Sequence, residues 1–384
     1  MNGPATPTPH IAYFVHDLGD AAVARRVAML QAGGAKVRVI GFRRADTAPT
    51  AISGAPAIDL GRTSDGRLGQ RALAVVGALN NGAALGAAVA GADVVMARNL
   101  EMLALAARAH RGRRLVYECL DIHRILLGTS FAARAIQHVE RGLLAGVDLV
   151  VTSSNRFADD YFRQRRGLKA PILLVENKVL EAPGSPPPPP PLAAGPPWVI
   201  GWFGMLRCRR SLELLTALVR QGQGRIRVVL AGRPAERELG DLAAHVAGVP
   251  GMTFAGRYAS ADLAALYGSV HFAWAIDYFE EGLNSAWLLP NRLYEALAHG
   301  SVPIALASVE TGRWLARHKV GLTIGDSDDA AAALLATMTT QSLAASRRAV
   351  AALPTETVTT TPAEMRHLVA AIVSGPLPSA ARAC

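Results

Sequence analysis

Cysteine, aromatic residues and charged residues are all scarce in this sequence of 384 residues. Its three cysteines, Cys119, Cys208 and Cys384, are too few and too scattered for a disulfide framework, which is typical of a reducing compartment. Charged residues make up 18% and hydrophobic residues 51%, so we expect no long disordered region. Aromatic residues make up 5% and form no stripe between the arginines, which argues against nucleic-acid binding.

Common signatures of ligand binding are also missing. Cys119 and His123 are four residues apart, but no second His/Cys cluster at ligand spacing accompanies them, so we expect no zinc site. The Gly-x-x-x-x-Gly-Lys-Ser/Thr pattern of P-loop enzymes is absent. Neither half opens with Gly-x-Gly-x-x-Gly after a strand, which argues against a nicotinamide-dependent dehydrogenase.

A secretory signal is not evident either. The first fifteen residues lack its basic, apolar and cleavage regions, so we expect a cytoplasmic protein. Residues 72–92 carry no formal charge and are long enough to span a bilayer. Most of them are alanine or glycine, and Asn80 and Asn81 lie in the middle, so one or two alanine-rich helices are the favoured interpretation.

The positive charge is concentrated in the N-terminal part. The formal net charge is +10, and 23 basic and 15 acidic residues precede Pro183, against 17 and 15 from there on. A local excess of this kind indicates an anionic partner.

Short β-branched segments alternate with helical ones along the chain, which predicts parallel βαβ units. Strands are expected at residues 11–16, 36–41, 93–97, 115–118, 148–152 and 172–175, and again at 198–203, 227–231, 252–255, 270–275, 302–305 and 321–324. The fold class is therefore α/β, with two doubly wound, Rossmann-like domains. Ligands of such sheets bind at the carboxyl ends of the strands.

A proline-rich segment separates the two patterns. Nine prolines lie between Pro183 and Pro197, six of them consecutive, and such a run forms a semi-rigid spacer. We expect an N-terminal domain over residues 1–182, a linker over 183–197, a C-terminal domain over 198–375 and a frayed tail over 376–384. Two such domains facing a cleft are the usual setting of a two-substrate active site.

The segment from Asn284 to Gly300 is the most informative. Pro290 suits the first position of a helix of about ten residues, and Gly300 the residue after its end. The start of a helix offers unpaired amides to a phosphate, and Glu295, one turn further on, can accept hydrogen bonds from both hydroxyls of a ribose. Alternatively, Glu295 only pairs with Arg292 on a solvated surface, and the residues alone leave both interpretations open.

Residues 288–305, LLPNRLYEALAHGSVPIA, resemble the nucleotide-sugar motif of retaining GT-B glycosyltransferases, in particular glycosyltransferase family four. Residues 198–204 and 206–211 are similar to that family's strand, glycine turn and basic loop, which hold the donor diphosphate. Residues 228–232 resemble its next strand and glycine, and residues 175–177 the end of its N-terminal domain. The resemblance implies a GT-B hexosyltransferase with a nucleotide-sugar donor such as UDP- or GDP-hexose.

The resemblance implies a donor site in the C-terminal domain. By register we favour Arg210 as the diphosphate ligand and place Arg207 second; alternatively, these two and Arg209 are surface cations at a helix start. The expected donor-binding residues are Gly204, Arg207, Arg210, Asn284, Ser285, Asn291, Arg292 and Glu295.

Catalytic residues follow from the resemblance and from the departures from it. Many family members carry a second glutamate where Trp287 stands here. Glu280, Glu281 and Asn284 in the preceding loop are the available substitutes, and we choose Glu281 as the catalytic candidate; alternatively, these acidic loop residues are merely solvated. His123 fits the position of a family histidine that faces the donor sugar and the acceptor, and Asp121 would orient the acceptor or, alternatively, cap the next helix. Gly19 is expected on the acceptor side.

Similar bacterial enzymes build exopolysaccharide or other cell-surface glycans on a lipid carrier. This implies a lipid-linked saccharide acceptor and a place on the inner face of the plasma membrane, in agreement with the N-terminal charge. We expect neither a metal nor a cofactor besides the donor. Two alternatives are a nucleotide-sugar epimerase or hydrolase of the same fold, and a catalytically silent module that binds sugar nucleotides.

Overall fold

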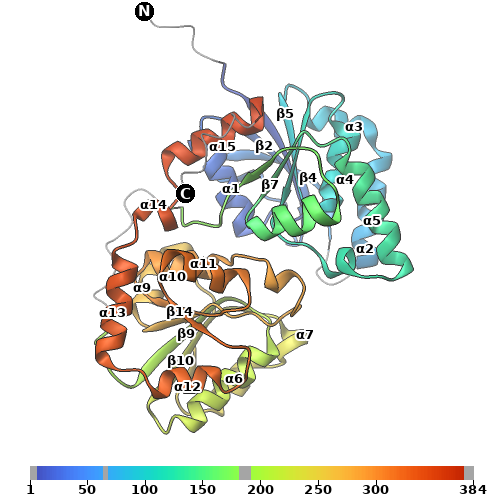
Figure 1. Cartoon of the computed structure of the whole chain (residues 1–384). Coiled ribbons are helices and arrows are strands. Elements are labelled where there is room, and N and C mark those ends of the chain that lie inside the picture. Colours follow the sequence, from blue (N-terminus) through green and yellow to red (C-terminus); the bar gives the residue numbers. More distant parts are fainter. Residues whose placement is uncertain (1–6, 64–67, 181–191, 376–384) are drawn as a thin grey trace, which may run out of the picture. The chain divides into compact units, whose positions relative to one another are not determined.

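The computed structural model describes residues 7–63, 68–180 and 192–375. The chain divides into two compact units (Figure 1). Unit 1 combines the residues up to Glu176 with those from Thr361 on, and unit 2 is Asn177–Thr360. Each unit is built on its own, mainly parallel sheet, which confirms the predicted fold class. The proline run 186–191 and the tail after residue 375 lie outside the described residues.

The sheet of unit 1 has eight strands. They are β1 (His10–Val15), β2 (Lys36–Arg43), β3 (Ala51–Ile52), β4 (Ala55–Arg62), β5 (Val94–Arg98), β6 (Arg114–Cys119), β7 (Leu149–Thr152) and β8 (Ile172–Leu174). Their order is β3-β4-β2-β1-β5-β6-β7-β8, and only β3 and β4 pair antiparallel. This hairpin was not predicted from the sequence, because β4 is largely half-buried and has no continuous apolar run.

The helices of unit 1 include two in the uncharged stretch. The helices are α1 (Ala21–Ala32), α2 (Leu68–Asn80), α3 (Gly82–Ala88), α4 (Leu100–Ala109), α5 (Phe131–Leu144) and α15 (Pro362–Ser374), with a 3-10 helix η1 (Arg124–Leu127) and a π-helix η2 (Phe157–Arg165). Asn81 separates α2 from α3, because its side chain accepts a hydrogen bond from the amide of Ala84 at 3.2 Å. Within the described ranges, no helix has both the length and the apolar character that crossing a membrane requires.

The last helix, α15, belongs to unit 1, whereas we expected the C-terminal domain to continue to residue 375. It packs against α1 (Figure 1). Arg114 of β6 donates a hydrogen bond through Nε to the carbonyl oxygen of Ile372 at 2.8 Å. An amphipathic helix at the end of a chain does not reveal which of two similar sheets it covers, so the sequence could not decide this point.

Gly33 tests the packing of α15. A Cβ at this position would lie 2.3 Å from the carbonyl oxygen of Met365, so an alanine would push α15 away from α1. We expect Gly33→Ala to reduce the stability of unit 1 by about 1–3 kcal/mol. The matched control is Gly77→Ala on α2, where a Cβ has no neighbour within 4 Å. Hydrogen exchange of residues 362–374 is the measurement, and unchanged protection there would contradict the packing.

Unit 2 contains a six-stranded sheet that is parallel throughout. Its strands are β9 (Trp198–Leu206), β10 (Ile226–Pro234), β11 (Met252–Phe254), β12 (Phe272–Trp274), β13 (Val302–Leu306) and β14 (Leu322–Ile324), in the order β11-β10-β9-β12-β13-β14. Its helices are α6 (Arg209–Gln221), α7 (Glu236–Leu239), α8 (Leu242–Ala247), α9 (Leu263–Gly268), α10 (Asn291–Ala298), α11 (Glu310–His318), α12 (Ala330–Ala336), α13 (Thr340–Ala351) and α14 (Thr355–Val358), with 3-10 turns η3 (Ser260–Asp262) and η4 (Asn284–Ala286).

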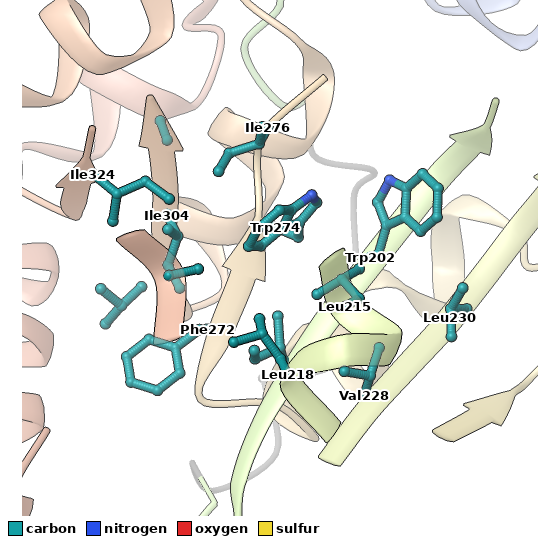
Figure 2. Packing of buried hydrophobic residues seen from close by; sticks show 14 of the residues in the cluster. Trp202, Leu215, Leu218, Val228, Leu230, Phe272, Trp274, Ile276, Ile304 and Ile324 are labelled. Carbon is teal, nitrogen blue, oxygen red and sulfur yellow. The ribbon is translucent and has the colours of Figure 1, made fainter. Parts of the chain in front are cut away.

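Both faces of this sheet are buried, as expected for parallel strands. Trp202 of β9 and Trp274 of β12 pack with leucines of α6 on one face (Figure 2). The indole N–H of Trp274 donates to Oγ of Ser211 at 3.1 Å, so this buried polar group is satisfied. Phe203, the next residue of β9, belongs to a separate cluster and meets Tyr267 of α9 edge to face, with ring centroids 5.0 Å apart.

In both units the strand order reverses beside the first strand. In unit 1 the chain proceeds from β1 to β2 and β4, and then returns to β5 on the other side of β1. In unit 2 it proceeds from β9 to β10 and β11, and then returns to β12. Doubly wound sheets bind ligands at the carboxyl ends of the strands next to this switch point. The switch points therefore lie after β1 and β5 and after β9 and β12.

Candidate functional site

Two glycines stand at the carboxyl ends of β9 and β10. Gly204 and Gly232 are partners in register, and both have positive φ angles, +106° and +132°. A Cβ on Gly232 would lie 1.9 Å from the carbonyl oxygen of Gly204, so only glycine allows this approach of the two backbones. A Cβ on Gly204 would lie 3.9 Å from the hydroxyl of Tyr258. The glycines thus keep the backbone bare at the switch point of unit 2.

Two arginines share one buried carboxylate in unit 2. Asp277 follows β12, its side chain is 7% exposed, and its Oδ2 lies 3.5 Å from Nη2 of Arg207 and 3.8 Å from Nη2 of Arg292. Its Oδ1 accepts a hydrogen bond from the amide of Phe279 at 2.9 Å, and the guanidinium of Arg207 lies over the ring of Phe279. Two cations on one anion leave a net positive charge. The structure thus brings together two predicted residues through Asp277, which the sequence analysis did not single out.

Arg292 has a hydrogen-bond donor that is available to a ligand. Its Nη1 is buried and makes no hydrogen bond within the described part of the chain. A buried donor without an acceptor costs free energy, so an anionic oxygen supplied by a ligand would be stabilised there. Arg292 is the second residue of α10, where the helix dipole also favours negative charge. We had expected Pro290 to be the first residue of this helix. It is instead the N-cap, and the helix has eight residues.

Glu295 lies one turn further along α10, half-buried. Its Oε2 accepts a hydrogen bond from the hydroxyl of Tyr267 at 3.0 Å. Burial raises the pKa of Tyr258 and Tyr267, and the negative charge of Glu295 raises the pKa of both further, so the two phenols stay protonated. This environment differs from the solvated pair with Arg292 that the sequence left open. A carboxylate fixed by a tyrosine is a preorganised acceptor for hydroxyl groups.

The arginine favoured by register is engaged elsewhere. Arg210 lies 2.8 Å from Glu281 and 2.8 Å from Asp328, and its guanidinium covers the ring of Tyr278. The two carboxylates are 57% and 70% exposed. Arg209 donates a hydrogen bond to the backbone carbonyl of Glu238. Of the three arginines in the predicted basic loop, Arg207 is therefore the one beside Asp277, and the preference for Arg210 finds no support in this geometry.

Asn284 and Ser285 lie in the loop between β12 and α10 and are 2% and 7% exposed. Oγ of Ser285 donates to the carbonyl oxygen of Glu280 at 2.8 Å, which closes the loop on itself. Nδ2 of Asn177 donates to the carbonyl oxygen of Leu289 at 2.9 Å, just before α10. Asn291, in contrast, is exposed at the start of α10. These contacts shape the loop, and contact with a donor remains a prediction for all of the predicted residues.

The predicted residues of unit 1 follow β1 and β6. Asp121 and His123 come after β6 and are both exposed. Nδ1 of His123 accepts a hydrogen bond from the amide of Ile125 at 3.3 Å, so His123, and not Asp121, caps the following helix η1. In a neutral ring, the proton is then on Nε2, which can donate to a sugar hydroxyl. Gly19 lies at the switch point after β1, where its amide donates to Oδ1 of Asp17 at 3.0 Å.

A buried charged network, missed by the sequence analysis, underlies this edge of unit 1. Glu118 is 0% exposed; its Oε1 lies 2.5 Å from Nε of Arg26, and its Oε2 3.3 Å from Nη1 of Arg98. The hydroxyl of Tyr13 donates to the same carboxylate. Burial raises the pKa of Glu118, but the two arginines together with the hydrogen bonds from Tyr13 and Arg26 lower it by more, so the carboxylate stays ionised. The network connects α1 with β1, β5 and β6.

No group of three or more His, Cys, Asp or Glu side chains that could hold a metal ion occurs in residues 7–63, 68–180 and 192–375.

The chain has a close relative among proteins of known role. No protein-family model matches the chain. Over 329 residues the chain is 49% identical to the succinoglycan biosynthesis protein ExoL of Rhizobium meliloti (strain 1021). The match covers 83% of this chain and 81% of the relative.

Solved structures resemble the chain over almost its whole length. Sucrose-phosphate synthase from Thermosynechococcus elongatus matches with a TM-score of 0.68 and 16% identity, over 94% of this chain and 98% of that one. Anabaena HepE, solved in complex with UDP and glucose, matches with a TM-score of 0.67 and 16% identity, over 95% and 99%. At this level of identity the likeness concerns the fold alone. It confirms the expected GT-B fold with two Rossmann-like domains.

Proposed function

Because the chain belongs to the family of the succinoglycan biosynthesis protein ExoL, we propose that it is a glycosyltransferase of exopolysaccharide synthesis that uses a nucleotide-sugar donor. The observation that carries this proposal is the pair Arg207 and Arg292 on Asp277, with Glu295 one turn further along α10. An excess positive charge and a fixed carboxylate on one switch point suit a diphosphate and a ribose.

The donor we propose is a UDP- or GDP-hexose. Its diphosphate would bind to Arg207, to Nη1 of Arg292 and to the first turn of α10, beside the bare backbone of Gly204. Glu295 would accept hydrogen bonds from the ribose hydroxyls. HepE, which shares the fold, has been solved with UDP-glucose as well as with UDP, and this supports the choice of donor class.

The reaction we propose proceeds with retention of anomeric configuration. As the glycosidic bond to the diphosphate breaks, negative charge develops on the leaving oxygen, and the two arginines stabilise it. The leaving phosphate would take the proton from the acceptor hydroxyl, and the acceptor oxygen would form the new bond to the anomeric carbon on the face that the diphosphate leaves, so no protein nucleophile and no metal ion is needed. Glu281, held by Arg210, would bind hydroxyls of the donor sugar.

The acceptor we propose is a lipid-linked saccharide at the inner face of the plasma membrane. Unit 1 would bind it through the segment around Gly19. Nε2 of His123 would donate to a sugar hydroxyl, and Asp121 would orient the acceptor. The name of the relative ExoL, a succinoglycan biosynthesis protein, supports a growing exopolysaccharide as the glycan.

Binding and product analysis test the proposal. A thermal-shift screen of UDP and GDP sugars identifies the donor, because a ligand that binds only the folded state raises Tm. Mass spectrometry after incubation with donor, with and without a lipid-linked acceptor extract, then separates the activities. Sugar transferred only in the presence of acceptor supports the proposal. An epimerised or hydrolysed donor without acceptor identifies the alternative enzymes, and binding without any product identifies a silent module.

Substitutions of Arg207 and of Arg210 are expected to have a large and a small effect, respectively, on the binding of the nucleoside diphosphate. Arg207→Ala removes charge-assisted hydrogen bonds to the diphosphate, each worth about 1.5–3 kcal/mol, and should weaken the binding of the nucleoside diphosphate roughly 10–100-fold. Asp277 keeps Arg292 as a partner, so the fold should be retained. Arg210→Ala should change the Kd less than about threefold, because its partners are exposed. Isothermal titration of both variants is the measurement, and a larger loss for Arg210→Ala would reinstate the ranking from register.

A further inference from the structure

Helix α5 presents two distinct flanks to solvent. Phe131, Ala135 and Val139, four residues apart, form an apolar flank on which Phe131 is 90% and Val139 55% exposed. Such spacing places the three side chains on one line along the helix. Single exposed apolar residues are common on protein surfaces, but an aligned set on one helix indicates a binding surface.

The other exposed flank of α5 is basic. Arg134, His138 and Arg141 are spaced by four and three residues and are all exposed. The helix has one acidic residue, Glu140, which is fully buried and lies 2.5 Å from Nε of Arg166. The charged residues that α5 presents to solvent are therefore all basic.

The inner side of α5 fixes this presentation. The hydroxyl of Tyr161 donates to both oxygens of Glu140 at 2.7 Å, which anchors the middle of the helix. Nε2 of Gln137 donates to the carbonyl oxygens of Leu126 and Gly128 at 3.0 and 2.9 Å, which anchors its first half to η1. Rotating α5 to bury Phe131 would break these bonds. The exposed flanks are thus a stable property of the fold.

Helix α2 extends the apolar character of the same helical layer. Leu73 and Val76 are three residues apart on α2 and are 73% and 52% exposed. Helices α2 and α5 both pack against α4. Two neighbours of α4 therefore carry large exposed apolar side chains.

We propose that the exposed side of α5 is a surface that inserts into anionic phospholipid membranes. An apolar flank beside a basic flank is the composition of a helix that lies in a bilayer interface, with its apolar side in the acyl region and its cations at the headgroups. The charge excess of the residues before Pro183 agrees with an anionic partner. The biological purpose rests on the proposed lipid-linked acceptor, but the binding itself needs neither donor nor acceptor.

Vesicle co-sedimentation of the full chain tests the proposal. The protein should bind vesicles of equal parts phosphatidylglycerol and phosphatidylcholine, and bind pure phosphatidylcholine far more weakly. Arg134→Gln/Arg141→Gln should lower the partition coefficient on the mixed vesicles about 25-fold, because one arginine near an anionic surface corresponds to about fivefold. Phe131→Ser should lower the partition coefficient about tenfold, since it removes the aromatic side chain that would insert into the bilayer. Raising the salt concentration should weaken binding through the two arginines.

Matched variants in unit 2 make the test specific. Arg220 and Arg313 are exposed on α6 and α11, and Arg220→Gln/Arg313→Gln removes the same charge. This control should bind the mixed vesicles as the wild type does. If its partition coefficient falls as much as that of the α5 variant, the attraction comes from the diffuse positive charge of the protein, and the proposal for α5 is wrong. Equal wild-type binding to both vesicle types would also overturn the proposal. So would a wild-type dimer in sedimentation velocity that dissociates in the α5 variants while vesicle binding persists, because α5 would then bind a second copy.

The outcomes for membrane binding and for sugar transfer are separable. All of these variants should show the thermal shift of the wild type with its nucleotide sugar, since α5 lies in unit 1 and the donor residues lie in unit 2. A protein that transfers no sugar but binds vesicles through α5 would refute the proposed function alone. A protein that transfers sugar but does not bind anionic vesicles would refute only the proposal for the α5 surface.

Discussion

Glu295→Gln is expected to reduce kcat/KM for sugar transfer about 100-fold or more. The glutamine keeps the size of the side chain but loses the charge that strengthens hydrogen bonds from the two ribose hydroxyls, each worth about 1.5–3 kcal/mol. The loss should be shared between KM and kcat to the extent that the ribose contacts tighten in the transition state. Steady-state kinetics with the donor identified by thermal shift provide the measurement.

Tyr267→Phe is the informative companion of this variant. Tyr267 donates to Glu295 at 3.0 Å and therefore positions the carboxylate without any contact with the donor being required. Its removal should cost less than the loss of the Glu295 charge, about tenfold, and should leave the preference for base and sugar unchanged. If Glu295→Gln keeps donor affinity and kcat/KM within threefold of the wild type, Glu295 is a structural residue of α10 and the ribose site lies elsewhere.

Glu118→Gln is expected to destabilise unit 1 by about 3–5 kcal/mol, the usual cost of removing one partner from a buried ion pair. Arg26 and Arg98 would keep their charges in an almost dry environment, at 5% and 8% side-chain exposure. Glu213→Gln on the exposed side of α6 is the matched control and should change stability by less than about 0.5 kcal/mol. Since two units can unfold separately, hydrogen exchange resolved by unit is a better measurement than a single Tm.

The same carboxylate gives the protein an acid-sensitive contribution to stability. The pKa of Glu118 is lowered in the folded state, so its ionised form stabilises the fold at pH values above the pKa of an unfolded glutamate. This contribution is lost as the pH falls through the folded-state pKa. In Glu118→Gln, the free energy of unfolding of unit 1 should therefore depend less on pH below about pH 4.3, the ordinary glutamate pKa. An unchanged acid limb in the variant would show that other carboxylates dominate acid unfolding.

The sequence predicted most strands, because parallel strands buried on both faces are continuous apolar runs. The predicted segments at 36–41 and 302–305, for example, correspond to β2 (Lys36–Arg43) and β13 (Val302–Leu306). The hairpin β3–β4 was not predicted, since the segment Ala55–Arg62 contains charged residues and a glycine instead of a continuous apolar run. The direction in which α15 packs also escaped, because it depends on a contact with Gly33 more than 300 residues away.

The segments of the candidate site were predictable from the sequence, but the contacts between its side chains were not. The resemblance identified the loop after β9 and the start of α10, and the structure shows that these segments adjoin one switch point of the sheet. It ranked Arg210 above Arg207 by register, but Arg207 precedes α6 and Arg210 lies in its first turn, and only the turn into α6 decides which side chain reaches Asp277. Asp277 itself had no signal, because a single aspartate after a strand is common in loops.

The position of α15 also determines the order in which the chain can fold during synthesis. Unit 2 is continuous in sequence, whereas unit 1 is completed by a segment that follows it. The contact of α1 with α15 can form only after the ribosome has made every residue of unit 2. The N-terminal sheet therefore leaves the ribosome with the surface around Gly33 uncovered, and the second domain can be finished before the first.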